Sequence, residues 1–221
     1  MNLVEGNTIF ERPADEQRSS DRLPSDRWDD FPYSELSQHD GACCKIAREW
    51  IQSMDFAQLN GAQLSSGPRS LRAKYKWGPS SWPMHWCEVV NRDTIDCGAH
   101  AALSRALFRA RGLTAFPVQL VQQFDRQATA QWRGKWSGEG VSCHWLDGSH
   151  IYHEVTALLT DGSEVKLWDA SAGSWIDPRQ SGGGYGSVSA MRIFVGAEHS
   201  RLGDLSWGER AISPNVWNQL S

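Results

Sequence analysis

The hydrophobic pattern of the chain has a helical period in two segments. Residues 41–60 carry apolar side chains at helical spacing, which predicts an amphipathic helix with Asp40 as its N-cap. The segment Asp96–Gly112 is dominated by Ala, Leu and Arg, which are strong helix formers. It begins with a good N-cap residue and ends with a glycine suited to the position after a helix. We therefore predict a second helix there.

Other segments have the pattern of strands. Residues 116–124 and 189–196 are β-rich runs, and two further runs surround Asp161-Gly162 as in a hairpin. Strands and helices together predict an α+β fold. The polar, proline-containing residues 1–38 predict an extended or partly disordered arm, tacked down by its aromatic side chains. Residues 39–221 are expected to form one catalytic domain.

The hairpin allows two registers. A two-residue turn pairs Thr160 with Ser163, whereas a three-residue turn with Gly162 in the left-handed conformation pairs Leu159 with Ser163. The apolar side chains of both strands fall on odd-numbered positions, namely Val155, Ala157, Leu159, Val165 and Leu167. Of these two registers, only the three-residue turn puts all of them on one face.

The preferred register brings a histidine and a carboxylate together. It places Val155 opposite Leu167 and His153 directly opposite Asp169, with Cβ atoms roughly 4.5–5.5 Å apart. The other register would separate His153 and Asp169 on opposite faces. We therefore predict that the two side chains meet on the buried face, just past the apolar ladder.

Cys97 lies where the second predicted helix begins. Free N–H groups at a helix N-terminus and a nearby imidazolium favour a thiolate, so we expect a thiol pKa below that of free cysteine. A histidine can accept the thiol proton, and an aspartate can hold the imidazole in a useful orientation. Taken singly, Cys97, His153 and Asp169 are more often packing, strand and turn residues. Taken together, they predict a catalytic set.

The order of these residues resembles the transglutaminase-like cysteine enzyme superfamily. The resemblance covers roughly residues 85–175 and is carried by DCGAHAALSRALFRARGL, YHEV and LWDAS. It implies a papain/transglutaminase-like core in which the nucleophile helix packs on an antiparallel β-sheet. Arylamine N-acetyltransferases share the same Cys-His-Asp arrangement and are a related possibility. The chain departs from the family where Glu154 and Val155 replace a frequent tryptophan, and where Ala170 replaces a frequent proline.

The resemblance implies cysteine-dependent acyl transfer through an acyl-thioester, which forms or exchanges an amide bond. The expected substrate is a peptide, an amide or an acyl-thioester, including a carrier-bound one, and the acceptor is an amine. Hydrolysis by a cysteine peptidase or amidase is the alternative, and a non-catalytic peptide- or ligand-binding module is an alternative of a different class. Candidate oxyanion and pocket residues are the Cys97 backbone N–H, Trp82, Trp86 and Gly98.

Composition and charge narrow the range of partners. A formal net charge of -4 and a pI of about 6.0 give no electrostatic reason to expect nucleic acid or an anionic membrane. No stretch approaches the ~20 apolar residues of a membrane span, and the start of the chain has no apolar signal segment. We expect a cytoplasmic location with five free thiols. The twelve tryptophans suggest core and pocket walls.

No metal or other cofactor is expected from the sequence. A zinc site would draw on Cys87, Cys97, Cys143, His144, His150 and His153, but these lack the short ligand pairs that zinc sites commonly show. Cys43 and Cys44 are interpreted as core or packing residues, and His100 as a surface or packing residue rather than one that faces the site. No calcium-binding loop is present. Residues 181–186 lack the context of a phosphate loop and suggest a mobile lid or spacer.

Overall fold

The computed structural model has an α+β fold. It describes residues 28, 31–38, 41–53, 70–159, 165–176, 186–195 and 200–201. Within these ranges the helices are α1 (Ala42–Ser53), α2 (Ser70–Lys74), α3 (Trp86–Val90), α4 (Cys97–Arg109) and α5 (Arg126–Gly138). The longer strands are β3 (Thr114–Gln123), β5 (His150–Leu159), β6 (Val165–Asp169) and β8 (Ser187–Val195). The shorter ones are β1 (Lys76–Trp77), β2 (Thr94–Ile95), β4 (Leu146–Asp147), β7 (Ser174–Ile176) and β9 (Ser200–Arg201).

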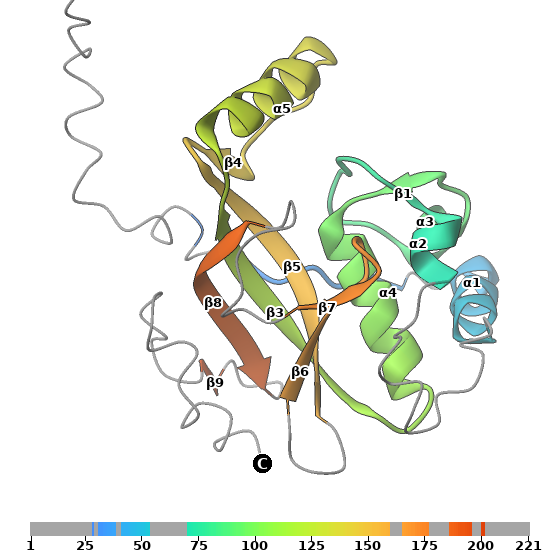
Figure 1. Cartoon of the computed structure of the whole chain (residues 1–221). Helices are drawn as coiled ribbons and strands as arrows, with labels where there is room; N and C mark the ends of the chain where they lie inside the picture. The colour runs from blue at the N-terminus through green and yellow to red at the C-terminus, as the bar shows by residue number, and fades with distance from the viewer. Residues whose placement is uncertain are drawn as a thin grey trace, which may run out of the picture.

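A curled antiparallel sheet forms the centre of the described structure. Its strand order is β7-β6-β5-β3-β8-β9, and β4 pairs with β5 beside this path. The two short strands β1 and β2 pair in parallel in a separate sheet. Helices α1, α2 and α3 gather near α4 on one side of the large sheet, whereas α5 projects past its end beside β4 (Figure 1).

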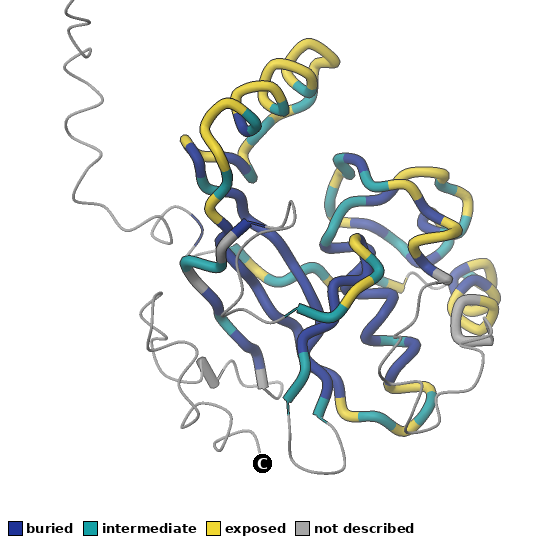
Figure 2. The backbone as a smooth tube through the Cα atoms, in the orientation of Figure 1, coloured by how far each residue is buried: buried dark blue, intermediate teal, exposed yellow. Residues whose placement is uncertain are grey.

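Both faces of the central strands are buried, as the dark tube along β3 and β5 shows (Figure 2). On one face, Leu158 and Trp168 pack in a cluster with Leu103 and Leu107 of α4. On the other face, side chains of the sheet itself pack together, namely Val118, Leu120, Val155, Ala157, Leu167, Met191 and Ile193. The apolar ladder predicted from alternation is thus confirmed for Val155, Ala157 and Leu167, but α4 covers the opposite face.

Helix α4 begins and ends as its sequence predicts. The Asp96 side chain accepts a hydrogen bond of 2.8 Å from the Ala99 backbone N–H, which satisfies one of the free donors of the first turn. Gly112, just past the end of the helix, adopts a φ of 73°, a conformation that costs little only for glycine. The helix runs along β5, since Ser104 Oγ lies 2.6 Å from Thr156 Oγ1.

The register of the β5–β6 hairpin differs from the prediction. Leu159 pairs with Val165 rather than with Ser163, so the three-residue turn is wrong. Thr156 pairs with Trp168, and the same register carried one step further puts Asp169 opposite Val155 instead of His153. Alternation distinguishes odd from even shifts only, so it could not separate the predicted register from one displaced by two residues. His153 and Asp169 still share a face.

Other expectations are met in part. Helix α1 lies within the predicted segment 41–60, while Asp40 and residues 54–60 fall outside the described residues, as do 181–185 of the expected lid. Strands β3 and β8 confirm the two single strand predictions. Helix α5 had not been predicted, because Thr129 is its one buried side chain and so no apolar stripe marks it.

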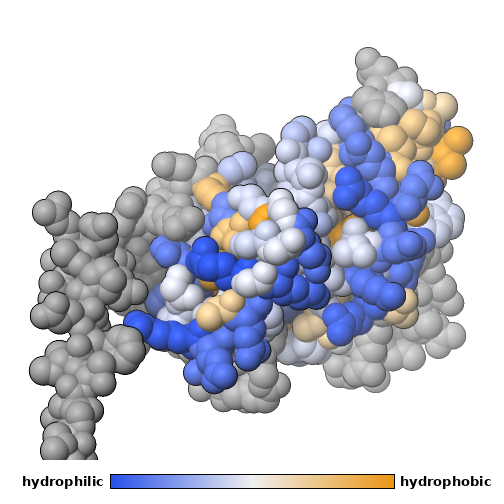
Figure 3. Space-filling view, turned by 90° about the horizontal axis from the view of Figure 1, so that it is seen from above, coloured by the Kyte–Doolittle hydropathy of each residue, from blue (hydrophilic) through white to orange (hydrophobic). Residues whose placement is uncertain are grey.

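The outer surface of the described residues is mixed. Seen from above, hydrophilic side chains cover most of it and apolar ones form smaller patches (Figure 3). No helix among the described residues has both the length and the apolar character needed to cross a membrane.

Candidate active site

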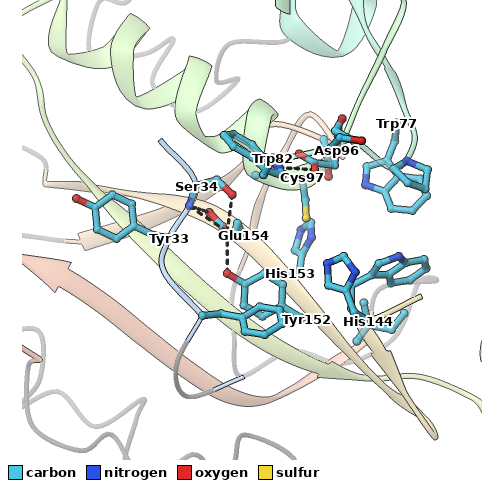
Figure 4. Close-up of a pocket in the computed structure, with 18 of the residues that line it drawn as sticks. Tyr33, Ser34, Trp77, Trp82, Asp96, Cys97, His144, Tyr152, His153 and Glu154 are labelled. Atoms are coloured by element: carbon cyan, nitrogen blue, oxygen red, sulfur yellow. Dashed lines mark hydrogen bonds between the residues drawn. The ribbon is translucent and has the colours of Figure 1, made fainter. Parts of the chain in front are cut away.

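Cys97, His153 and Asp169 converge at the N-terminal end of α4. The sulfur of Cys97, the first residue of the helix, points at the imidazole of His153 (Figure 4). The His153 Nε2 atom lies 2.8 Å from Asp169 Oδ2. Because Asp169 occupies Nε2, the nitrogen left for the thiol is Nδ1. The three residues that the sequence singles out are therefore brought together in one row, with His153 between the thiol and the carboxylate.

The two carboxylate oxygens of Asp169 have separate partners. Oδ1 accepts hydrogen bonds from the Ser171 backbone N–H at 2.9 Å, the Ser171 hydroxyl at 2.7 Å and the Ala172 N–H at 3.0 Å. Oδ2 is left for His153. The turn-forming role and the imidazole-orienting role, which compete as interpretations of the sequence, thus coexist in one side chain. The turn fixes the carboxylate before it meets the histidine.

Burial and mutual contact set the protonation of the Cys97–His153 pair. Burial is the largest influence on Cys97 and raises the pKa of its thiol, while the hydrogen bond and charge of His153 act to lower it. Burial lowers the pKa of His153, but Asp169 and Cys97 together raise that pKa well above its usual range. The expected low thiol pKa is therefore wrong. Cys97 needs His153 in order to lose its proton.

Glu154 is the centre of a buried network beside the thiol. Its carboxylate accepts hydrogen bonds from the Ser34 N–H at 2.9 Å, the Ser34 hydroxyl at 2.8 Å and the Tyr152 hydroxyl at 2.7 Å (Figure 4). The guanidinium of Arg105, from α4, donates to the Ser34 carbonyl. Burial raises the pKa of Glu154, and these partners oppose the rise. The network joins β5, α4 and the N-terminal segment 31–38.

Aromatic side chains hold the N-terminal segment in place, as predicted from its composition. The Trp28 indole donates a hydrogen bond of 3.0 Å to the His144 carbonyl. The Phe31 ring lies 5.4 Å from that of Tyr152, between ring centroids. Tyr33 and Phe194 are 4.9 Å apart by the same measure. The segment therefore forms one wall of the site.

The two tryptophans proposed for the pocket have different surroundings. The Trp82 indole N–H donates a 2.7 Å hydrogen bond to Asp96 Oδ2, so it steadies the cap of α4 rather than facing an oxyanion. Trp86 is buried in the core among the helices and is not among the residues that line the pocket. The Cys97 N–H remains as a donor, because the first N–H groups of a helix have no acceptor within it.

Gly98 provides clearance for a neighbouring segment of the chain. A Cβ atom at Gly98 would lie 2.1 Å from Ser34 Oγ and 2.7 Å from Ser34 Cβ. Such distances are far below van der Waals contact. The absence of a side chain at Gly98 therefore allows the N-terminal segment to reach Glu154 across the start of α4.

His100 lies inside the protein, which fits a packing role and excludes a surface one. It is fully buried, and its ring meets the Tyr75 ring edge to face at 6.2 Å between centroids. Burial lowers the pKa of His100 to about 4, so the ring is neutral at physiological pH.

The thiol opens into a large cavity of about 1400 Å³. Trp82, Gly98, His153 and Asp169 line it together with Cys97. Much of the remaining wall is aromatic, contributed by Phe31, Trp77, Phe124, Trp132, Trp145 and Tyr152. The space is large enough for an acyl group and an acceptor, and its walls favour apolar or aromatic groups.

Several residues of this site escape a search for motifs in the sequence. Glu154 stood out only as a departure from a family pattern, and Ser34 lies 120 residues from it in the chain. Tyr152 and Arg105 carried no spacing signal.

Comparison of the chain with known protein families, curated proteins and solved structures finds no match.

The first prediction concerns the charge that Asp169 places beside His153. In Asp169→Asn the carboxylate charge that raises the pKa of His153 is lost, so that pKa falls. His153 then gives up its proton at lower pH than in the wild type. An NMR titration of the histidine ring protons measures this shift.

The matched control for this titration is Asp125→Asn. Its carboxylate caps α5 through the Gln127 and Ala128 N–H groups and contacts neither His153 nor Cys97. The pKa of His153 should be unchanged in this variant. An equal pKa in Asp169→Asn and the wild type would contradict the assignment.

The second prediction concerns Gly98 and Ser34. Gly98→Ala should lower the free energy of unfolding by roughly 1–3 kcal/mol, the usual cost of overpacking, because Ser34 must move. In a Ser34→Gly background the same substitution should instead stabilise by up to about 1 kcal/mol through helix propensity. Urea unfolding of the four proteins measures both.

The control for the Gly98 substitution is Gly134→Ala in α5, where an added Cβ meets nothing within 4 Å. Its effect should be the same whether residue 34 is serine or glycine. If Gly98→Ala had equal effects in the two backgrounds, the contact with Ser34 would not explain the glycine.

Proposed function

We propose that this protein is a cysteine-dependent acyltransferase that forms or exchanges an amide bond through an acyl-thioester on Cys97. The observation that carries the proposal is the row Cys97–His153–Asp169, with the thiol open to an aromatic cavity. The packing of the nucleophile helix on an antiparallel sheet supports a papain/transglutaminase-like core. The substrate class we propose is a peptide, an amide or an acyl-thioester.

In the first half-reaction Cys97 becomes acylated. His153 accepts the thiol proton at Nδ1 as the sulfur attacks the acyl carbonyl carbon, which gives a tetrahedral oxyanion. The Cys97 N–H, at the positive end of α4, is placed to stabilise that charge. When the intermediate collapses, His153 returns the proton to the leaving group. The product is an acyl-thioester on Cys97 and a free amine or thiol.

In the second half-reaction an amine replaces the sulfur. The amine nitrogen attacks the thioester carbonyl while His153 accepts its proton, and the C–S bond breaks as the amide forms. The proton on His153 then returns to the Cys97 sulfur, which restores the starting state. Asp169 stabilises the imidazolium in both halves and keeps Nδ1 directed at the thiol.

Water is the competing acceptor, and hydrolysis uses the same intermediate. The aromatic lining of the cavity supports transfer to an amine, because apolar walls bind an organic acceptor and hold fewer water molecules than a polar site. The short hydrogen bonds of Glu154 and Ser34 satisfy the polar groups of the wall next to the thiol. We therefore favour amide formation over amide hydrolysis as the reaction of this protein.

The third prediction tests the intermediate directly. When the full chain is incubated with a panel of small acyl-thioesters, intact mass should increase by one acyl group, and peptide mapping should locate that group on Cys97. Cys97→Ala should abolish the adduct. His153→Ala should slow its formation by roughly 10²–10⁴-fold, the usual contribution of a general base.

Cys143→Ala is the matched control, since Cys143 is a half-buried thiol that does not contact His153. It should acylate at the wild-type rate. A panel that left Cys97 unmodified, or modified all five cysteines alike, would contradict the proposal. Adding a primary amine then separates transfer from hydrolysis, because transfer yields the amide product and hydrolysis yields the free acid.

A further inference from the structure

A second group of thiols lies outside the catalytic site. Cys43 and Cys44 are at the start of α1, and Cys87 is in α3. Their three sulfur atoms lie within 4.8 Å of one another. In the part of the chain that the structure describes, they are the one group of three or more residues whose ligand atoms are close enough to share a metal ion. The sulfurs of Cys44 and Cys87 are 3.2 Å apart.

The packing of α1 against α3 creates this cluster. Cys44 is fully buried in the core beside α3, and Cys87 packs against the same core. Cys43 is exposed, so the cluster has one buried side and one side open to solvent. Because 43 residues separate Cys44 from Cys87 in the chain, no short ligand pair marks the site in the sequence.

The spacing of the sulfurs suits a thiophilic ion. Zinc binds thiolate sulfur at about 2.3 Å, so two sulfurs on one tetrahedral zinc are about 3.8 Å apart. The observed separations, from 3.2 Å to at most 4.8 Å, bracket that value. Small rotations of three side chains would place all three sulfurs around one point. A disulfide between Cys44 and Cys87 would use two of the thiols and leave the convergence of the third unexplained.

We propose that Cys43, Cys44 and Cys87 bind one zinc ion through their sulfur atoms, with the fourth coordination position open to solvent. Each thiol that binds gives its proton to solvent, so the ligands are thiolates in the bound state. Thiolates are the ligands that favour zinc over harder divalent ions. The site is separate from the catalytic thiol and does not depend on the proposed acyl transfer.

Such an ion would hold α1 to α3 and so steady one wall of the catalytic cavity. The chain just before α3 contributes Trp82 to that wall, and the Trp82 indole holds the Asp96 cap of α4. Ser37 of the N-terminal segment also contacts His85, at the start of α3, with 2.8 Å between Oγ and Nδ1. The ion would therefore act as a structural crosslink between α1 and α3.

The fourth prediction is tested with Zn²⁺ alone. The full chain, purified with a non-thiol reductant, is stripped of metal and titrated with Zn²⁺ in competition with a chromophoric chelator. One equivalent should bind. Cys43→Ser should weaken binding by more than ~10-fold, because even the loss of an outer-shell partner commonly costs that much. Cys43 is exposed, so this variant should keep the fold, which circular dichroism checks.

Two matched variants define the site. Cys143→Ser and Cys97→Ser should bind Zn²⁺ as the wild type does, and the second separates the metal site from the catalytic thiol. Failure to bind one equivalent, or equal affinity in Cys43→Ser and the wild type, would overturn the proposal. So would a Cys44–Cys87 disulfide, found by mass analysis, in the protein as isolated and before any metal is stripped.

Discussion

The hydrogen bond between His153 Nε2 and Asp169 Oδ2 is the interaction on which the rest of the site depends. It fixes which imidazole nitrogen faces Cys97, and it stabilises the imidazolium that forms when His153 accepts a proton, against the opposing effect of burial. The sheet supplies the backbone for this contact, since β5 and β6 are neighbours. The turn at Ser171 supplies the orientation, since it occupies the other carboxylate oxygen. Burial disfavours the Cys97 thiolate, and the imidazole is the neighbour that opposes this effect.

The N-terminus of α4 is the second constraint, and it is supported from two directions. From one side, Trp82 and the Ala99 N–H satisfy the Asp96 carboxylate that caps the helix. From the other side, Ser34 crosses over Gly98 to reach Glu154. Segments that precede the helix by 14 residues or more thus complete the surroundings of Cys97. The cavity wall, the Asp96 cap and Cys97 are thus linked through these contacts.

Much of this arrangement could be predicted from local signals. Asp96, the Ala- and Leu-rich run and Gly112 predict α4, and odd-numbered apolar positions predict that His153 and Asp169 share a face. The exact partner across the hairpin could not be predicted, because alternation is blind to a shift of two residues. Contacts between distant segments were also beyond local signals, namely Ser34 with Glu154 and Cys44 with Cys87. Helix α5 was missed because it stands apart and buries little.

The central claim is that His153 makes the Cys97 thiol reactive. It is tested most directly by alkylation with iodoacetamide at neutral pH, with the rates at Cys97 and Cys143 followed by peptide mass in the wild type and in His153→Ala. Loss of the imidazole should raise the thiol pKa and so slow the alkylation of Cys97 by ~10-fold or more. This should occur although the smaller side chain opens the site, and Cys143 should be unaffected. Equal rates at Cys97 in the two proteins would contradict the account.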